Sequence, residues 1–397
     1  MAMQGGNFKH YVIEMSHRHF SLVVTQTLVA LSNTMANAFA LIYLYKSGAD
    51  YVQCSLFVLI AVLVPTVLIA FASRPLIRNF AEAIETAIMF LIAYYVSLMF
   101  LDGWYLVLIP PVLFGVYMAA FWVPYNALIM HITSRKKRGA VVGIYFLIFP
   151  LVSTTAPLLG GLVIGGWSYQ VLFGIAAAIS TANLVFVAGL RIFSTLRERI
   201  IVPELLQSLK IHLVGKVHID LDLKGVDWRI KMALFAEGIQ DGIFWIIIPL
   251  VSFEFAKSEV VVSGYLSLFA FWGAVMTVAL GYLSDRLKDR AYIVRVGAAF
   301  GTVSIMFAAY ANSAEEYLSA MSIAYFWIAM IPSFLFTMLV DKLERFKRKG
   351  VLIREFFLNC GRCIGVLVVI LVLLSGAGLG ATLTVAAIAL ASIILVK

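Results

Sequence analysis

The chain contains a succession of about twelve apolar stretches, each near the roughly 20 residues that a helix needs to cross a bilayer. Hydrophobic residues make up 62% of the sequence and charged residues 13%, whereas a soluble globular chain is about half apolar and about a quarter charged. A water-soluble fold cannot bury that much apolar surface, so we expect a polytopic α-helical membrane protein. The predicted spans are 20–44, 52–73, 84–101, 105–131, 140–163, 169–191, 230–254, 260–283, 292–310, 316–340, 353–375 and 378–396.

Along the chain, loops rich in lysine and arginine alternate with loops that contain almost none. One set of loops holds only Lys46 and Lys257 as cations, together with several acidic residues. Lysine and arginine mark the cytoplasmic side of a membrane protein, so we expect both termini in the cytoplasm and a location in the plasma (inner) membrane. This placement accounts for the net charge of +9 without a nucleic-acid partner. The basic loops contain Arg74, Arg78 and the segments 135–138, 192–228, 286–290 and 342–349.

The two halves of the chain are related by a shift of 211 residues. Lys46 superposes on Lys257 and Gly139 on Gly350 (257 − 46 = 350 − 139 = 211). A repeat of six spans in the same orientation predicts two bundles related by an axis along the membrane normal, with a substrate site between them near the midplane. The predicted parts are a cytoplasmic tail at 1–19, bundles at 20–191 and 230–397, and a cytoplasmic linker at 192–229.

The loop after the eighth span reads GYLSDRLKDR, from Gly281 to Arg290. It resembles the inner-loop signature of the major facilitator superfamily, and the resemblance extends over nearly the whole chain. It implies an all-α fold of about twelve helices in two pseudo-twofold related bundles, working by alternating access. Gly281 would let two helices approach closely, and Asp285 would sit at a helix N-terminus. With Arg286 and Arg290 they are candidate gating residues.

Two further segments resemble motifs of the same family. The first-half copy of the inner loop keeps Arg74 and Arg78, but Arg74 stands where the family has an aspartate. The fifth span contains APLLGG, which is similar to the family's antiporter motif through Pro157, Gly160 and Gly161. The resemblance implies export and a gating role for these residues. Close helix packing and a proline kink would explain them equally well.

Two spans of the second half carry ionisable residues. The seventh reads MALFAEGIQDGIFWIIIPL, which puts Glu237, Gln240, Asp241 and Trp245 on one helical face. Counted from the cytoplasmic ends at Arg229 and Gly350, Asp241 and Arg362 both lie twelve residues in (241 − 229 = 362 − 350 = 12), at a depth of roughly 18 Å, so we expect an ion pair. Either this pair is a permanent clamp, or it opens as substrate binds. Glu237, for which the sequence offers no partner, is the preferred proton carrier.

The first half offers neutral polar and aromatic groups instead. Gln26 is the counterpart of Glu237 in the repeat (237 − 26 = 211). In the family resembled, the first, fourth, seventh and tenth spans line the cavity, so Tyr325 and Trp327 are added to the candidates. An aromatic cavity with few charges favours an amphipathic or apolar organic substrate over a polyanion. The first-half candidates are Gln26, Asn33, Asn37, Trp122, Tyr125 and Asn126.

These features predict a secondary transporter that exports a small amphipathic organic molecule by exchange for protons. We expect it to act as a monomer in the lipid bilayer, without a cofactor, a metal ion or catalytic residues. Cys360 and Cys363 are interpreted as packing residues. One alternative is an uptake symporter or a facilitator of a small metabolite. A different class of alternative is a membrane-embedded enzyme, which should cluster His, Asp or Ser near one interface, or a lipid scramblase, which should have a polar lipid-facing groove.

Overall fold

The computed structural model describes residues 5–78, 80–132, 138–189, 226–283, 290–342 and 347–395, and this part of the chain is helical throughout apart from short connections. The helices of the first half are α1 (Gly5–Lys46), α2 (Tyr51–Arg78), α3 (Phe80–Phe100), α4 (Gly103–Ile132), α5 (Arg138–Ser153), α6 (Ala156–Gly166) and α7 (Tyr169–Gly189). Those of the second half are α10 (Trp228–Ala256), α11 (Glu259–Leu283), α12 (Arg290–Ala309), α13 (Ala314–Ile328), α14 (Met330–Lys342), α15 (Lys347–Leu374) and α16 (Leu379–Ser392), followed by the 3₁₀ turn η3 (Ile393–Leu395).

Within the described ranges, eleven helical segments are long and apolar enough to cross a membrane. The twelfth predicted span corresponds to a shorter apolar helix, Leu379–Leu395. The chain is therefore a multi-pass integral membrane protein. The segment predicted as a linker at 192–229 lies almost entirely outside the described residues, and α10 begins at Trp228.

Two spans that were predicted as continuous helices are broken. The fifth divides into α5 and α6 at Thr154 and Thr155, whose amides bond to carbonyls only three residues back. The tenth divides into α13 and α14 at Ala329. Pro157 and Pro332 each follow a break by two or three residues. A proline ring clashes with the carbonyl four residues earlier and disfavours the helical conformation of the residue before it.

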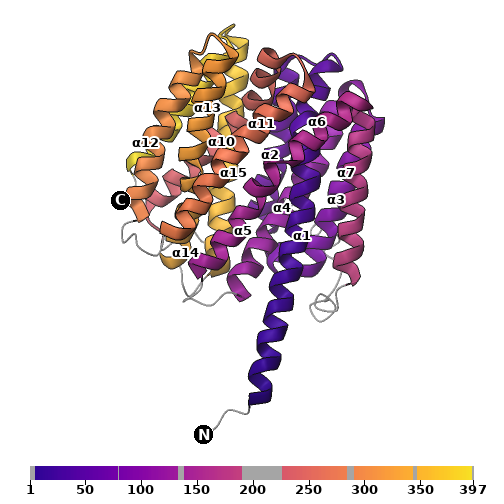
Figure 1. The fold of residues 1–397 in the computed structure, drawn as a ribbon, viewed down its shortest axis with the longest axis vertical. Helices are drawn as coiled ribbons and strands as arrows, with labels where there is room; N and C mark the ends of the chain where they lie inside the picture. The colour runs from indigo at the N-terminus through magenta and orange to yellow at the C-terminus, as the bar shows by residue number, and fades with distance from the viewer. Residues whose placement is uncertain are drawn as a thin grey trace.

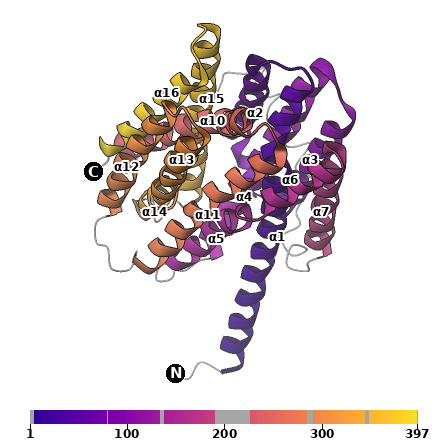
Figure 2. The ribbon, with the colours of Figure 1, turned by 45° about the horizontal axis from the view of Figure 1, so that its top comes forward.

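The two halves repeat the same packing. In the first half α1 packs on α5, α6 and α7, while α3 packs on α4 and α7; in the second half α10 packs on α15 and α16, while α12 packs on α13 and α16. Figures 1 and 2 show the halves side by side, the first in indigo and magenta and the second in orange and yellow. The predicted arrangement of two related bundles is confirmed.

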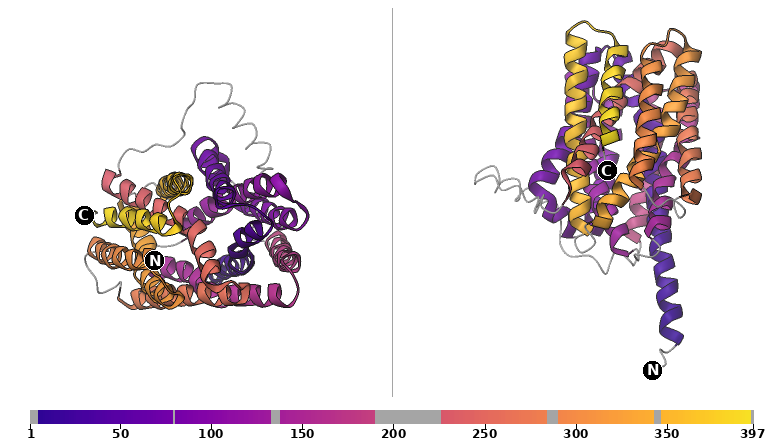
Figure 3. Two further views of the ribbon diagram at one scale, coloured as in Figure 1. Left: turned by 90° about the horizontal axis from the view of Figure 1, so that it is seen from above. Right: turned by 90° about the vertical axis from the view of Figure 1, so that its left-hand side faces the viewer.

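The halves meet in two contacts that the repeat relates to each other: α2 packs on α15, and its counterpart α11 packs on α5 and α6. We call the side of the molecule where α1 ends at Lys46 the far side, and the opposite side, from which the N-terminal part of α1 projects, the termini side (Figure 3). Between the two sides the halves enclose cavities, and the predicted site residues lie around them.

Candidate functional site

The polar residues of α10 line a cavity of about 320 Å³ in the second half. Glu237, Gln240, Asp241 and Trp245 all border this cavity, which confirms that they share one face of the helix. Arg362 borders it from α15. Every one of these side chains is held on a transmembrane helix, where an ionisable group is costly and is a functional candidate by default.

Glycines bring α10 and α15 into backbone contact beside this cavity. A Cβ atom on Gly361 would lie 2.1 Å from the carbonyl oxygen of Phe235, and one on Gly238 would lie 2.2 Å from a carbonyl oxygen of α15. Gly242 and Gly365 have equally close backbone neighbours one turn further along their helices. Each helix thus carries a Gly-x-x-x-Gly pair, the pattern that lets membrane helices cross closely. Sequence analysis did not single out these two pairs.

The predicted ion pair between Asp241 and Arg362 is present. The guanidinium donates from Nε to Asp241 Oδ2 at 2.7 Å, and Nη2 lies 2.6 Å from the same oxygen. Its Nη1 donates to Oδ1 of Asn359 at 3.1 Å, and its Cζ lies 4.7 Å from the ring centroid of Trp245. All three nitrogens of Arg362 are therefore engaged, and the ring of Trp245 fixes the plane of the guanidinium.

The prediction that Glu237 has no partner was wrong. Arg354 Nη2 lies 3.9 Å from Glu237 Oε1, while Arg354 Nη1 donates to Glu355 Oε1 at 2.6 Å. The predicted span of 353–375 put Arg354 and Glu355 at its very start, whereas α15 begins at Lys347 and carries both residues into the bundle. The second oxygen, Glu237 Oε2, is buried and has no hydrogen-bond partner among the described residues.

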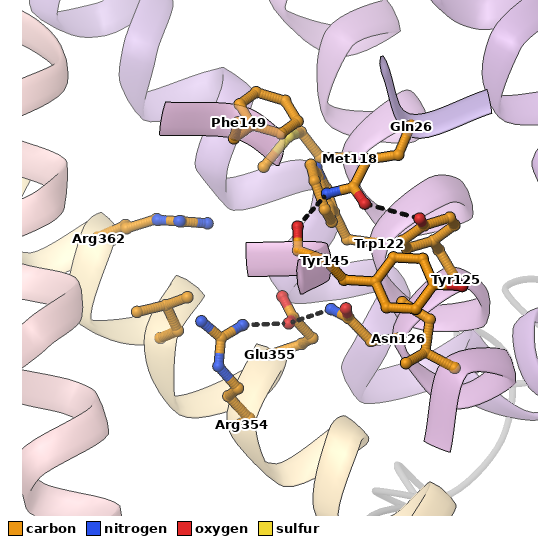
Figure 4. Close-up of a pocket in the computed structure, with 12 residues that line it drawn as sticks. Gln26, Met118, Trp122, Tyr125, Asn126, Tyr145, Phe149, Arg354, Glu355 and Arg362 are labelled. Carbon is orange, nitrogen blue, oxygen red and sulfur yellow. Dashed lines mark hydrogen bonds and ion pairs between the residues drawn. The ribbon is translucent and has the colours of Figure 1, made fainter. Parts of the chain in front are cut away.

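A hydrogen bond joins the two halves on the termini side of the cavities. Asn126 of α4 donates from Nδ2 to Glu355 Oε1 at 3.2 Å, and both residues border a cavity of about 290 Å³ (Figure 4). Arg354 lies on the same wall, so Glu355 accepts from both halves at once. Arg362 borders this cavity, the 320 Å³ cavity and a third, central cavity, and is thus common to all three.

The predicted polar residues near the termini side of the first half form a network of their own. Gln26 donates from Nε2 to the carbonyl oxygen of Tyr145 at 3.0 Å, and the Tyr125 hydroxyl donates to Gln26 Oε1 at 2.7 Å (Figure 4). The network links α1, α4 and α5 and stands opposite Arg354 and Glu355 across the 290 Å³ cavity. No charged side chain of the first half takes part in it among the described residues.

The central cavity has a volume of about 600 Å³ and is lined by both halves. Asn33, Asn37 and Trp122 border it as predicted, and Asn37 Oδ1 accepts a hydrogen bond of 2.6 Å from the hydroxyl of Tyr94. Tyr325 also lines this cavity, but the expectation for Trp327 was wrong, because Trp327 borders a separate pocket between α11 and α13. A step of two residues turns a helix by about 200°, so Tyr325 and Trp327 face opposite ways.

On the far side, charged and hydroxyl groups connect the two halves. Lys46 at the end of α1 forms an ion pair of 2.6 Å with Glu259 at the start of α11. The hydroxyl of Tyr169 donates to the same carboxylate at 2.8 Å, and the hydroxyl of Tyr51 donates to Glu254. We call these five residues the far-side contacts. The sequence alone did not predict the pairing of Lys46 with Glu259.

The antiporter-like segment lies where the halves touch. A Cβ on Gly160 would lie 2.2 Å from the carbonyl oxygen of Met35 in α1, and one on Gly161 would lie 2.4 Å from Oγ of Ser263 in α11 of the other half. Pro157 borders the central cavity. The two adjacent glycines therefore allow α6 to pack closely within its own bundle and against the opposite bundle.

The other predicted gating residues fall largely outside what the structure describes. Asp285 and Arg286 lie outside the described residues, and so do the side chains of Arg74 and Arg78. Gly281 lies in the last turn of α11, and Arg290 begins α12. A gating role for these six residues stays a prediction.

Comparisons with known proteins agree with this architecture. The chain is 24% identical over 360 residues to the uncharacterized protein YqgE of Bacillus subtilis (strain 168), covering 87% of this chain and 79% of that protein. Its fold is similar to the crystal structure of the human organic anion transporter MFSD10 (TETRAN), with a TM-score of 0.65, 13% identity, and coverage of 95% of this chain and 97% of that one. The family profile described as Major Facilitator Superfamily matches residues 22–366. The chain belongs to the major facilitator superfamily of membrane transporters.

Proposed function

We propose that this transporter exports a small amphipathic organic molecule in exchange for protons, by alternating access around the central cavity. The observation that carries the proposal is the excess of carboxyl groups beside the cavities. Glu237, Asp241 and Glu355 stand against two arginines, Arg354 and Arg362. A carboxyl group that is out of reach of water favours its protonated form unless a cation approaches it. Glu237, one of whose oxygens has no hydrogen-bond partner in the part of the chain that the structure describes, is the group best suited to exchange a proton.

The shape and lining of the central cavity support an amphipathic substrate. Its wall is largely apolar and aromatic, with Phe114, Phe244 and Trp245 among the lining residues, and Asp241 with Arg362 supplies a polar end. Binding sites for small molecules commonly combine an apolar wall with a few polar groups that fix orientation. MFSD10 is an organic anion transporter, but a likeness at 13% identity extends only to the fold.

The sequence and the family resemblance support the proposed export and orientation. The described helix ends that flank the basic segments, such as Ile132 of α4 and Arg290 of α12, lie on the termini side, and the distribution of lysine and arginine in the sequence favours the cytoplasm of a plasma (inner) membrane for that side. The antiporter-like segment, with its adjacent glycines between the halves, supports exchange over symport. We propose that a monomer is the working unit, because both halves of the cavity come from one chain.

The proposal is tested with Glu237→Gln in liposomes that contain a pH-sensitive dye. Compounds are first selected by thermal shift, since a ligand raises the apparent stability of the state it binds. We expect wild-type protein to move protons when such a compound is added, and the variant to bind the compound without moving protons, because an amide cannot titrate. The matched control is Asp102→Asn, the same kind of change at an exposed position between α3 and α4. Unchanged proton flux in Glu237→Gln contradicts the assignment of Glu237.

The far-side contacts should hold the transporter closed on that side. In the Lys46→Glu variant a carboxylate faces the carboxylate of Glu259, and the two repel each other. Because a partly exposed ion pair is worth up to about 1 kcal/mol, opening on the far side should become about two- to fivefold more frequent. Cys363 lies between α15 and α2 and reports such opening through its rate of labelling by a thiol reagent, with Cys54 and Cys360 replaced by serine. The double variant Lys46→Glu/Glu259→Lys should restore the slow rate. Equal labelling in all three proteins would exclude a role in closure.

A further inference from the structure

The arginines beside the cavities are already bound by carboxylates. Arg362 contacts Asp241 through Nε and Nη2 and donates from Nη1 to Asn359. Arg354 donates from Nη1 to Glu355. An incoming anion would have to displace one of these internal carboxylates to reach a guanidinium. The site is thus poorly prepared for an anionic group, although it contains two arginines.

One negative charge is left over in the same place. Three carboxyl groups face two guanidinium groups, so the fully ionised cluster has a net charge of −1 (2 − 3 = −1). Glu237 is the group in excess, since its Oε1 lies 3.9 Å from Arg354 while its Oε2 has no hydrogen-bond partner among the described residues. Glu237 is only 6% exposed, and an unbalanced buried charge is unfavourable unless a cation or a proton neutralises it.

The described part of the first half does not supply the missing positive charge. The described residues that it contributes to the three cavities include no lysine, arginine or histidine. Around Glu237 itself, the charged and titratable neighbours among the described residues are Asp241 on its own helix and Arg354, Glu355 and Arg362 on α15. Tyr325 on α13 lines the same cavity. Among these described neighbours, both positive charges have carboxylate partners.

An aromatic wall continues from Glu237 into the larger space. The 320 Å³ cavity and the 600 Å³ central cavity share Phe244, Trp245 and Tyr325 as lining residues, and the rings of Phe244 and Tyr325 stack with centroids 6.0 Å apart. Aromatic faces attract cations, and they also offer a broad apolar surface to an organic body. Carboxyl groups and ring faces therefore occur together on the walls of two adjoining cavities.

We propose that the transporter selects amphipathic organic monocations, whose charged centre approaches Glu237 and Asp241 while the apolar body occupies the aromatic central cavity. The cation and a proton are then alternative partners of Glu237, so one neutralises the cluster when the other leaves. This inference rests on the proposed function and specifies its substrate class. It also predicts a ratio of one proton for each monovalent cation.

Two ions of matched shape and opposite charge test the inference: tetraphenylphosphonium and tetraphenylborate. Their binding to the purified full-length protein is measured by equilibrium dialysis. We expect tetraphenylphosphonium to bind with at least about tenfold higher affinity than tetraphenylborate, a difference of the size that one cation–π or ion-pair contact can supply in a site shielded from water. Protons should compete, so the apparent affinity for the cation should fall as the pH is lowered. The Glu237→Gln variant should bind the cation more weakly and without this pH dependence, and Asp102→Asn should behave as wild type.

Several results would overturn the inference. They are equal or stronger binding of tetraphenylborate, no binding of tetraphenylphosphonium, and cation binding by the wild-type protein that is independent of pH. The pH titration of the wild type decides the matter if Glu237→Gln does not fold. If tetraphenylborate binds better while Glu237→Gln still abolishes substrate-driven proton flux, the proton-coupled function stands and only the substrate class is wrong.

Discussion

Replacing Gly361 with leucine should unfold or grossly destabilise the protein. The new Cβ would lie 2.1 Å from the carbonyl oxygen of Phe235, and the obstacle is backbone, which cannot rotate away. Overpacking of a core usually costs about 1–3 kcal/mol. Here α10 and α15 must also separate, which removes the contact between Gly238 and Gly361 and pulls Asp241 away from Arg362. We therefore expect a cost at or above the upper end of that range, seen as a large fall in Tm and in the yield of monodisperse protein.

The control is the same substitution at Gly264. This glycine lies in α11, and a Cβ built there has no atom within 4 Å outside its own helix turn. Since leucine is a better helix former than glycine by roughly 1 kcal/mol, Gly264→Leu should leave Tm unchanged or raise it. Similar Tm values for the two variants would mean that the crossing of α10 and α15 is looser than the structure indicates.

The fold could be predicted because the hydropathy of each span and the repeat of the two halves are visible in the sequence itself. Spans of about 20 apolar residues are recognisable without knowledge of their neighbours. The shift of 211 residues then assigns each span a counterpart, and the packing of α1 with α7 recurs as that of α10 with α16. The ion pair between Asp241 and Arg362 was predictable for a related reason, because depth in a membrane can be counted from the ends of a helix.

Other parts of the site depend on which helices meet, and a single sequence does not contain that information directly. The Gly-x-x-x-Gly pairs at Gly238 and Gly361 are visible in the sequence, but nothing in it says that they face each other. Arg354 was overlooked because the hydropathy of α15 rises only after its first turns, whereas the helix begins at Lys347. The contact of Lys46 with Glu259 joins residues 213 positions apart, and loop charges are usually solvated, so no local signal pairs them.

Removing one member of the ion pair should be the second most damaging change. Arg362→Leu leaves Asp241 without its cation, and breaking a buried pair in this way typically costs about 3–5 kcal/mol. We expect about 3 kcal/mol, the lower end, because the side chain of Asp241 keeps 32% of its surface exposed toward the cavity. Asp241→Asn should lower the free energy of unfolding by a similar amount, because it leaves the guanidinium of Arg362 without its carboxylate partner, and the side chain of Arg362 is only 10% exposed. Both costs are measurable as falls in Tm.

The double variant Asp241→Asn/Arg362→Leu separates the two roles that the sequence left open. Replacing both partners of a buried pair is often nearly neutral for stability, so the double variant should regain most of the Tm lost by either single variant. If the ion pair serves only to hold the helices together, the double variant should regain transport together with stability. We expect stability without transport, because Arg362 borders all three cavities and Asp241 faces the aromatic wall. Recovery of substrate-driven proton flux in the stable double variant would assign the pair to structure and leave Glu237 as the carboxyl group that exchanges the proton.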